Sequence, residues 1–218
     1  MTGAHPLQYL WWLVSRASGI LALVLISVSV VLGLAMAAKV LRCATLKRAV
    51  MGLHEYLAMT GLAAIGVHGL ALLGDHWLKP GWRGIIIPFA LSYRPGFTGL
   101  GIIAGYLAVL VGPSFYLRRR IGARRWRTVH RATLLVWVLS AVHTLGSGSD
   151  GSTSWLRALV LAPVAPVVYL LVVRALGSER RPAARAHDHG AERLARPDHA
   201  RLDRRREPLT VLPEVNRS

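Results

Sequence analysis

Long uninterrupted apolar blocks constrain this chain more than any other feature of its sequence. Five such blocks occur, and at about 1.5 Å of rise per residue each can cross the roughly 30 Å hydrocarbon core of a bilayer, the fourth only just. Hydrophobic residues make up 53% of the 218, and the mean hydropathy is +0.42. The sequence therefore predicts an all-α integral membrane protein, a bundle of about five transmembrane helices over residues 11–38, 50–73, 97–117, 128–145 and 155–173.

The two ends of the chain lead to separate expectations. The first apolar block is too long for the hydrophobic region of a cleaved signal peptide and lacks a basic start, so we expect it to be retained. Residues 178–218 are rich in Arg, Ala and Pro and offer little to bury, which predicts a disordered basic tail. We therefore expect a membrane domain over residues 1–177 and a tail over 178–218. Three histidines of the tail are interpreted as solvated side chains rather than as a weak metal site; they are His187, His189 and His199.

The net charge of +17 is concentrated in the loops and the tail. Such a charge can indicate nucleic-acid binding, but beside apolar helices it is better explained by membrane topology and by attraction to anionic lipids, so no nucleic acid is expected. With five spans, the two basic loops and the tail share one face, which the positive-inside rule assigns to the cytoplasm, with the N-terminus outside. The loop charges are Lys39, Arg42, Lys47 and Arg48, and then Arg118, Arg119, Arg120, Arg124, Arg125 and Arg127.

The cysteine content and the outer loop narrow the possibilities further. Cys43 is the only cysteine, so the chain can form neither an internal disulfide nor a Cys-based zinc or iron–sulfur site. Residues 74–96 are expected on the outer face and contain four aromatic residues and three prolines. Aromatic residues suit the lipid–water interface, so this loop is expected to be an interfacial segment or a lid over an outer site.

Four histidines lie inside predicted spans. His54 and His68 are on the second span, and His130 and His143 are on the fourth. Ionisable side chains are costly within a membrane helix and usually mark a functional site. One such histidine is readily explained by helix packing, whereas two on each of two helices at nearly equal separations indicate a shared purpose.

The separations place these histidines at two matching depths. His54 and His68 are fourteen residues apart, a rise of about 21 Å, and His130 and His143 are thirteen apart, a rise of about 19.5 Å. Both helices run in the same direction, so His54 and His130 share the inner depth while His68 and His143 share the outer depth. Two facing pairs are therefore predicted.

Each facing pair can hold one haem iron from opposite sides. Neutral imidazole is a good iron ligand, and two axial imidazoles fill the coordination sphere, which favours electron transfer over binding of oxygen or substrate. Two haems at two depths would carry electrons across the bilayer. Packing histidines, another metal site and a proton relay are the alternatives.

The angle between the two histidines of the fourth span does not fit a regular helix with both side chains on one face. At about 100° per residue, fourteen residues return to within about 40° of the same helix face, but thirteen leave the two histidines about 140° apart. The fourth span is therefore locally irregular, or the two haems approach it from different directions.

Two arginines are candidate partners of haem propionates. Arg131 follows His130 directly at the inner level, and Arg16 lies near the outer end of the first span. Each is equally well explained as an interfacial arginine that extends towards the lipid headgroups.

The histidine spacing resembles that of the ferric reductase-like transmembrane family, which includes ferric reductases, the membrane domain of NADPH oxidases and the MsrQ-type haem subunit of a methionine sulfoxide reductase system. The resemblance covers roughly residues 10–175. It rests on thirteen residues between His54 and His68 and twelve between His130 and His143, a spacing that the family shares. The remaining similar stretches are Val129-His130-Arg131, Ile87-Pro88-Phe89, Tyr93-Arg94-Pro95 and Gly146-Ser147-Gly148-Ser149-Asp150.

The resemblance implies two b haems, an inner one on His54 and His130 and an outer one on His68 and His143, and outward electron transfer. Ferric reductases and NADPH oxidases carry a flavin and nicotinamide domain, but this sequence has no dinucleotide fingerprint. A separate cytoplasmic flavoprotein or a quinol is therefore expected as donor, and ferric iron, a partner enzyme or oxygen as the extracytoplasmic acceptor. The family's usual six spans are reduced to five here.

Two further functions remain open. A quinol-linked cytochrome b of the respiratory type also holds two haems between two helices, although with equal histidine spacings. A haem-binding sensor or assembly protein would bind haem without conducting electrons.

Overall fold

The structure is a computed structural model that describes residues 9–177. The chain separates into two units, Met1–Arg174 and Ala175–Ser218. The predicted tail at 178–218, with its three histidines, lies outside the described residues. Within the described residues every regular element is a helix.

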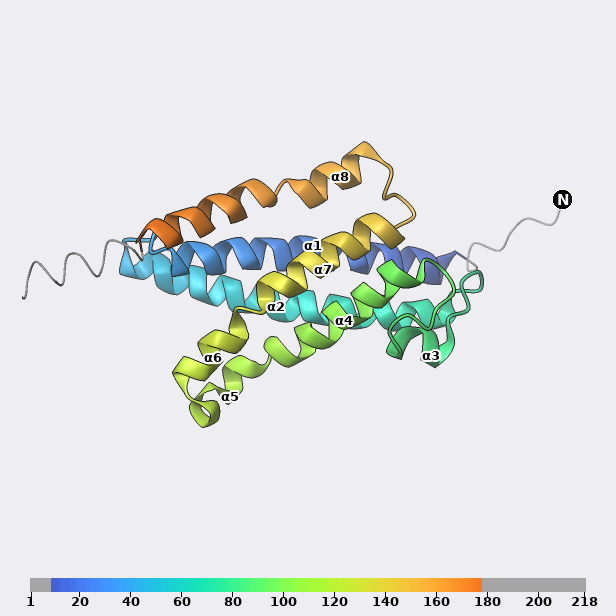
Figure 1. Ribbon diagram of the computed structural model, residues 1–218, viewed down its shortest axis with the longest axis horizontal. Coiled ribbons are helices and arrows are strands. Elements are labelled where there is room, and N and C mark those ends of the chain that lie inside the picture. Colours follow the sequence, from blue (N-terminus) through green and yellow to red (C-terminus); the bar gives the residue numbers. More distant parts are fainter. Residues whose placement is uncertain (1–8, 178–218) are drawn as a thin grey trace, which may run out of the picture. The chain divides into compact units, whose positions relative to one another are not determined.

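The first two helices form a long antiparallel pair (Figure 1). Helix α1 spans Leu10–Ala37 and α2 spans Ala44–Ala71. Both run for 28 residues without a proline, and a helix satisfies every backbone N–H and C=O group internally, as a bilayer requires. The side of α1 that is buried carries mostly small or slender residues, namely Ser15, Ala22, Leu23, Ser27, Ser29, Val30 and Leu34.

A second antiparallel pair consists of α4 (Pro95–Val111) and α7 (Thr133–Ser147). Helix α4 starts with Pro95 in its first turn, where the missing N–H costs no hydrogen bond. It is followed by α5 (Ser114–Ile121) after a bend of 52°. The bend falls at Pro113, which has no N–H to donate and disturbs the preceding turn.

The predicted fourth span is interrupted directly after His130. Helix α6 covers Ala123–His130, and α7 begins at Thr133. In between, the N–H groups of Arg131 and Ala132 bond three residues back, to Thr128 and Val129. This tighter winding turns each residue about 20° further than an α-helix does. It therefore rotates His130 and His143 towards a common side, which reduces the misfit noted above and identifies the local irregularity.

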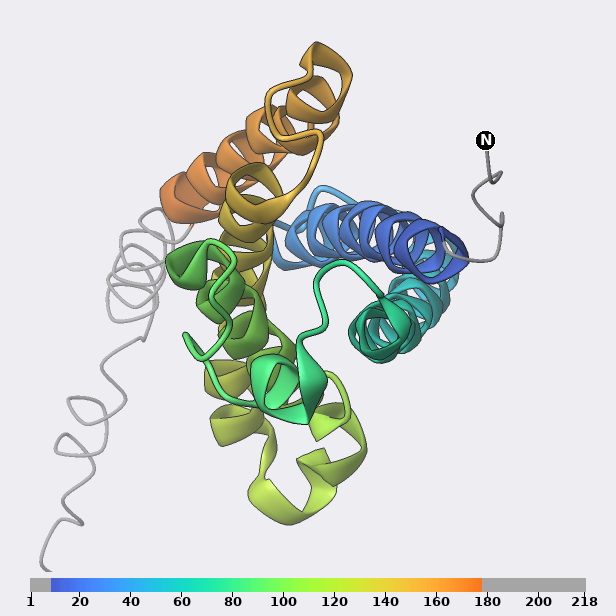
Figure 2. The same ribbon diagram turned by 90° about the vertical axis from the view of Figure 1, so that its right-hand side faces the viewer.

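The remaining elements cover the two pairs. The short elements η2 (Leu72–Gly74) and α3 (Gly81–Ile86) belong to the outer loop. Helix α8 (Ser154–Leu161) resumes after a turn at 162–163, and its inner side packs on α1 and α7 (Figure 2). Two buried clusters form there, one of Leu23, Leu156 and Val160, the other of Val30, Leu34, Trp137, Val167 and Leu170.

Three described helices are long and apolar enough to cross a membrane: Leu10–Ala37, Ala44–Gly74 and Ser154–Gly177. A fourth span results if the bent pair Pro95–Val111 and Ser114–Ile121 is counted as one. Large apolar side chains face outward on these helices, such as Leu110, which is 69% exposed. The chain is thus an all-α membrane protein, as predicted. The predicted fourth span differs, because α7 has only 15 residues and follows a break.

Candidate functional site

The four histidines of the predicted spans meet as two pairs. The ring centres of His54, on α2, and His130, at the end of α6, are 6.0 Å apart, with the ring planes inclined at 85°. The ring centres of His68, on α2, and His143, on α7, are 6.2 Å apart, with an inclination of 73°. These are the pairs that the depth arithmetic predicts, and we call them the inner pair and the outer pair.

The separation of the ring centres fits two imidazoles on opposite sides of one metal ion. A metal–imidazole bond is about 2 Å long and the ring centre lies roughly 1 Å beyond the nitrogen, which gives about 6 Å between the two centres. Direct stacking or a direct hydrogen bond between the rings is not needed to explain the arrangement. Each pair therefore has the spacing of a bis-imidazole site.

Both imidazoles of the outer pair are anchored through Nδ1. His68 donates from Nδ1 to the main-chain carbonyl of Ser15, at 2.7 Å, and His143 donates to that of Phe97, at 2.9 Å. A carbonyl oxygen can only accept, so the proton of each ring is on Nδ1 and Nε2 keeps its lone pair. This second-sphere contact is the one that metal-binding histidines ordinarily make.

Only one imidazole of the inner pair is anchored in this way. His54 donates from Nδ1 to the carbonyl of Ser29, at 2.8 Å. His130 stacks on Trp126, with ring centres 5.0 Å apart and planes at 24°, and its Nδ1 is buried without a hydrogen-bond partner among residues 9–177. In the inner pair, therefore, a hydrogen bond fixes the ring of His54, whereas an aromatic contact holds the ring of His130.

A metal ion at either pair needs further ligands. Among residues 9–177, no group of three or more His, Cys, Asp or Glu side chains lies close enough to hold a metal ion. Two imidazoles supply only two of the six positions of an octahedral ion. The donor set therefore fits a cofactor that brings its own equatorial ligands and leaves two axial positions open.

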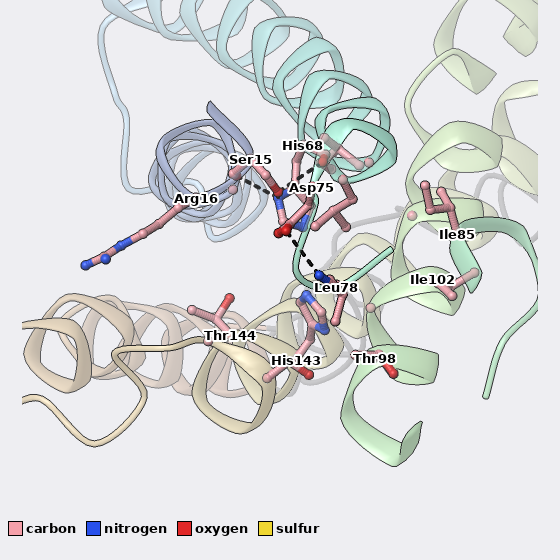
Figure 3. A pocket seen from close by; sticks show the side chains of 18 of the residues that line it. Ser15, Arg16, His68, Asp75, Leu78, Ile85, Thr98, Ile102, His143 and Thr144 are labelled. Carbon is pink, nitrogen blue, oxygen red and sulfur yellow. Dashed lines mark hydrogen bonds between the residues drawn. The ribbon is translucent and has the colours of Figure 1, made fainter. Parts of the chain in front are cut away.

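A cavity of about 680 Å³ adjoins the outer pair. This volume lies within the range of about 300–1,000 Å³ that is usual for small-molecule and cofactor sites. His68 and His143 project into it from opposite sides (Figure 3). Most of the other lining residues are apolar or glycine, including Ile20, Leu62, Ile65, Gly66, Ile102 and Gly105.

The outer loop forms part of the cavity wall. Asp75, Trp77 and Tyr93 of the predicted 74–96 segment line the cavity. The loop is tied to its neighbours, because Arg94 bonds to the carbonyl of Gly146 at 2.5 Å and Tyr106 bonds to that of Ile86 at 2.5 Å. Of the two predicted roles for this loop, the structure favours that of a cover over an outer site.

The two candidate arginines are placed differently. Arg16 borders the cavity, but its guanidinium extends away from both histidines of the outer pair (Figure 3) and forms an ion pair with Asp150 in the loop before α8. It also lies over the ring of Trp12, 5.0 Å from the ring centre. Arg131 is exposed in the break between α6 and α7. Neither guanidinium contacts a histidine pair in the structure.

The chain is similar to MsrQ proteins. A relative from Salmonella arizonae, named protein-methionine-sulfoxide reductase heme-binding subunit MsrQ, is 33% identical over 94 residues, which are 42% of this chain and 39% of the relative. An MsrQ from Azospira oryzae is 31% identical over 138 residues, 62% of this chain and 55% of the relative. An MsrQ from Salmonella paratyphi B is 30% identical over 123 residues, 56% and 48% of the two chains.

The similarity to MsrQ proteins is partial. This chain spans between about two fifths and just over half the length of these curated relatives. No family model matches the chain. No solved structure matches it either.

Sequence reasoning identified the four histidines but missed the groups that anchor them. Ser15, Ser29 and Phe97 act through main-chain carbonyls, and any residue type provides a carbonyl, so their identity carries little signal. Trp126 was also missed, although its position four residues before His130 places it on the same side of α6. His76 lies in the outer loop, is exposed, and belongs to neither pair.

Proposed function

We propose that the chain is a membrane b-type cytochrome that passes electrons across the bilayer through two haems. His54 and His130 would hold the inner haem, and His68 and His143 the outer haem. The observation that carries the proposal is the pair of ring separations, 6.0 and 6.2 Å, at two levels of one helix bundle. The chain then acts as the electron-transfer subunit of an oxidoreductase rather than as a complete enzyme.

The donor set supports haem over a protein-only metal site. Each pair offers two imidazoles, and residues 9–177 offer no group of three potential metal ligands. The largely apolar cavity beside His68 and His143 suits a buried macrocycle. When bound, haem iron supplies one-electron chemistry between its ferric and ferrous states.

The chain's own residues perform three tasks in this proposal. The imidazoles hold the iron, and the carbonyls of Ser15, Ser29 and Phe97 fix three of the rings with Nε2 free. The outer loop shields the outer pair from water. Between the two levels, Trp137 is 6% exposed and donates its ring N–H to Ser27 at 3.0 Å, which fills the core with packed side chains.

The proposed orientation puts the inner pair near the cytoplasm. The basic loops around 39–48 and 118–127 would face the cytoplasm together with the tail, and the N-terminus and the loop 74–96 would lie outside. Arg131 and Arg16 would then be available to inner and outer haem propionates respectively, Arg16 after exchange of its Asp150 partner.

The electron donor would be a cytoplasmic flavoprotein or a quinol. The acceptor would lie on the outer face, with ferric iron, oxygen or a partner enzyme as candidates. The names of the relatives favour a partner enzyme, since those proteins are called subunits of a protein-methionine-sulfoxide reductase.

The first experiment is a spectrum of the purified chain after expression with sufficient haem, before and after dithionite, with haem quantified as its pyridine complex. A reduced b-type α band and two haems per chain are expected. A colourless protein would end the proposal, and one haem per chain would remove one of the two sites.

The second experiment separates a conductor from a haem protein that only senses. Proteoliposomes with a trapped reductant and an external ferric chelate should reduce the chelate at a rate that depends on the protein. Liposomes that contain a variant with both His54 and His68 replaced by Ala serve as the control. Haem-loaded protein without flux would identify a sensor or assembly factor instead.

The native cysteine tests the orientation. Cys43 is exposed between α1 and α2, where the backbone N–H groups of Leu46 and Thr45 lower the pKa of its thiol and favour the reactive thiolate. A membrane-impermeant maleimide should label it in inside-out vesicles and not in intact cells. The reverse pattern would invert the proposed direction of the two pairs.

A further inference from the structure

Helix α1 carries the same short pattern twice. Ser15 is followed four residues later by Gly19, and Ser29 is followed four residues later by Gly33. The two patterns are fourteen residues apart, the separation of His54 and His68 on α2. Because α1 and α2 are antiparallel, equal separations bring one Ser–Gly pattern opposite each histidine.

At each level the serine and the histidine bond to each other in both directions. The Nδ1 of His68 donates to the carbonyl of Ser15, and the hydroxyl of Ser15 donates to the carbonyl of His68, at 3.2 Å. The Nδ1 of His54 likewise donates to the carbonyl of Ser29, whose hydroxyl donates to the carbonyl of His54, at 3.1 Å. Each serine thus fixes both the ring and the backbone of its histidine.

The glycines provide the space for the rings. A Cβ atom on Gly19 would lie 2.9 Å from Nδ1 of His68, and one on Gly33 would lie 3.0 Å from Cε1 of His54. Contacts this short require a shift of the ring or of the helix. In an α-helix the carbonyl of residue i points along the helix to residue i+4. A glycine at i+4 therefore uncovers that carbonyl for a second donor.

Helix α4 repeats the arrangement once. His143 donates to the carbonyl of Phe97, and its ring lies against Gly101, four residues further on, where a Cβ atom would collide with Nδ1. His130 has no counterpart: α4 ends at Val111, and the bend at Pro113 directs the next turns elsewhere. The absence fits the unpartnered Nδ1 of His130 in the described part of the chain.

We infer that Ser15–Gly19, Ser29–Gly33 and Phe97–Gly101 are three anchors that position His68, His54 and His143 as Nε2 ligands, and that His130 has no anchor. The inference deepens the proposed function and rests on it for the nature of the ligand. The anchors are positioning groups: they touch the imidazoles and act through them. Each anchor serves one histidine, so its loss affects one haem.

The test replaces each α1 glycine by alanine in the full chain. Gly19→Ala should lose or perturb the outer haem, and Gly33→Ala the inner haem, so that haem falls from two per chain towards one. Gly52→Ala is the control, because Gly52 lies within the neighbouring helix α2 and its Cβ would meet nothing within 4 Å. The readouts are haem per chain and the low-spin EPR signals of the ferric protein.

A milder variant guards against simple misfolding. Ser15→Ala and Ser29→Ala keep the carbonyl acceptor and remove only the hydroxyl, so both haems should stay, while the midpoint potential and EPR signal of one haem change. Without the hydroxyl the backbone of the histidine is no longer held, so the Nδ1 bond to the carbonyl weakens. A weaker bond gives the imidazole less anionic character and favours the ferric state less. Ser15→Ala should change the outer haem, and Ser29→Ala the inner haem.

The outcomes separate the two proposals. A wild-type chain without haem contradicts the proposed function. A wild-type chain with two haems contradicts the anchor inference alone in either of two cases. In one, the glycine variants keep both haems with unchanged signals. In the other, a single glycine variant loses both haems, since the anchors are then structural and not specific to one site.

Discussion

The outer and inner pairs share helix α2 but hold their rings differently. In the outer pair both His68 and His143 donate to main-chain carbonyls. In the inner pair only His54 does so, while His130 rests against Trp126 at the end of α6. The rings of the outer pair therefore have a fixed tautomer and orientation, and one ring of the inner pair does not.

The difference follows from the helices behind the rings. Helices α1 and α2 are continuous over both levels, so α1 contacts a histidine at each. Helices α4 and α7 are continuous only at the outer level, because α4 ends at Val111 and α7 starts at Thr133. Breaks in two neighbouring helices at one level thus leave His130 to be held by a short amphipathic helix. An anchored and an unanchored imidazole differ by about one net hydrogen bond, or about 0.5–1.5 kcal/mol.

The largest expected effect comes from removing a ligand. Alanine at His54 or His130 should remove the inner haem only, and alanine at His68 or His143 the outer haem only, because each iron loses an axial ligand. Haem per chain should fall from two to one in each case, measured as the pyridine complex. His76→Ala, in the outer loop, is the control and should keep two. If the variants of the two histidines of one pair lost different haems, the pairing would be contradicted.

The single-haem variants then compare the pairs directly. Carbon monoxide must displace an axial imidazole to bind reduced haem. The inner site, seen alone in His68→Ala, should bind it about five-fold more readily than the outer site, seen alone in His54→Ala, since about 1 kcal/mol of anchoring is missing. Spectral titration of the two reduced variants measures this. Equal affinities would remove the distinction between the pairs.

The stacking of Trp126 on His130 should contribute at the inner site by no more than an anchoring hydrogen bond does. Aromatic pairs of this kind are worth about 0.5–1.5 kcal/mol beyond burial, so Trp126→Leu should raise carbon monoxide affinity a few-fold at the inner site and leave the outer site unchanged. Trp82→Leu, at an exposed tryptophan in α3, is the control. An equal change at both sites would indicate a general loosening of the bundle.

The ion pair over the outer cavity should contribute least. Arg16 and Asp150 are 32% and 19% exposed, so solvent weakens their attraction. A double-mutant cycle of Arg16→Gln and Asp150→Asn, read as the thermal loss of the outer haem band, should give a coupling below about 1 kcal/mol. A coupling of several kcal/mol would mean that the loop before α8 is a main support of the outer pair.

Much of this arrangement could be predicted from the sequence. The hydropathy blocks predicted an all-α membrane protein, and the residue counts between histidines predicted which rings meet. Both depend on the regular rise of a helix, which is set by local geometry. An irregular fourth span was one of two explanations for the angle between His130 and His143, but the sequence did not indicate the position of the break after His130. Beside that break, Phe115 of α5 packs on Trp126 of α6.

Other features depended on contacts distant in sequence. The partner of Arg16 lies 134 residues away in a loop, beyond the reach of local reasoning. The glycines of the anchors were within reach, because the fourteen-residue repeat of Ser15 and Gly19 on α1 matches the histidine spacing on α2. Two occurrences on one helix are too few to indicate a repeat until the matching spacing on α2 is compared with it.

The two anchors on α1 have a consequence for how the sites are filled. They belong to one continuous helix, so a slide of α1 along α2 releases His54 and His68 at the same moment. A cofactor seated at one level holds the helices in register and thereby prepares the other level. Loading of one level would thus favour loading of the other without being required for it, and without any contact between the two cofactors.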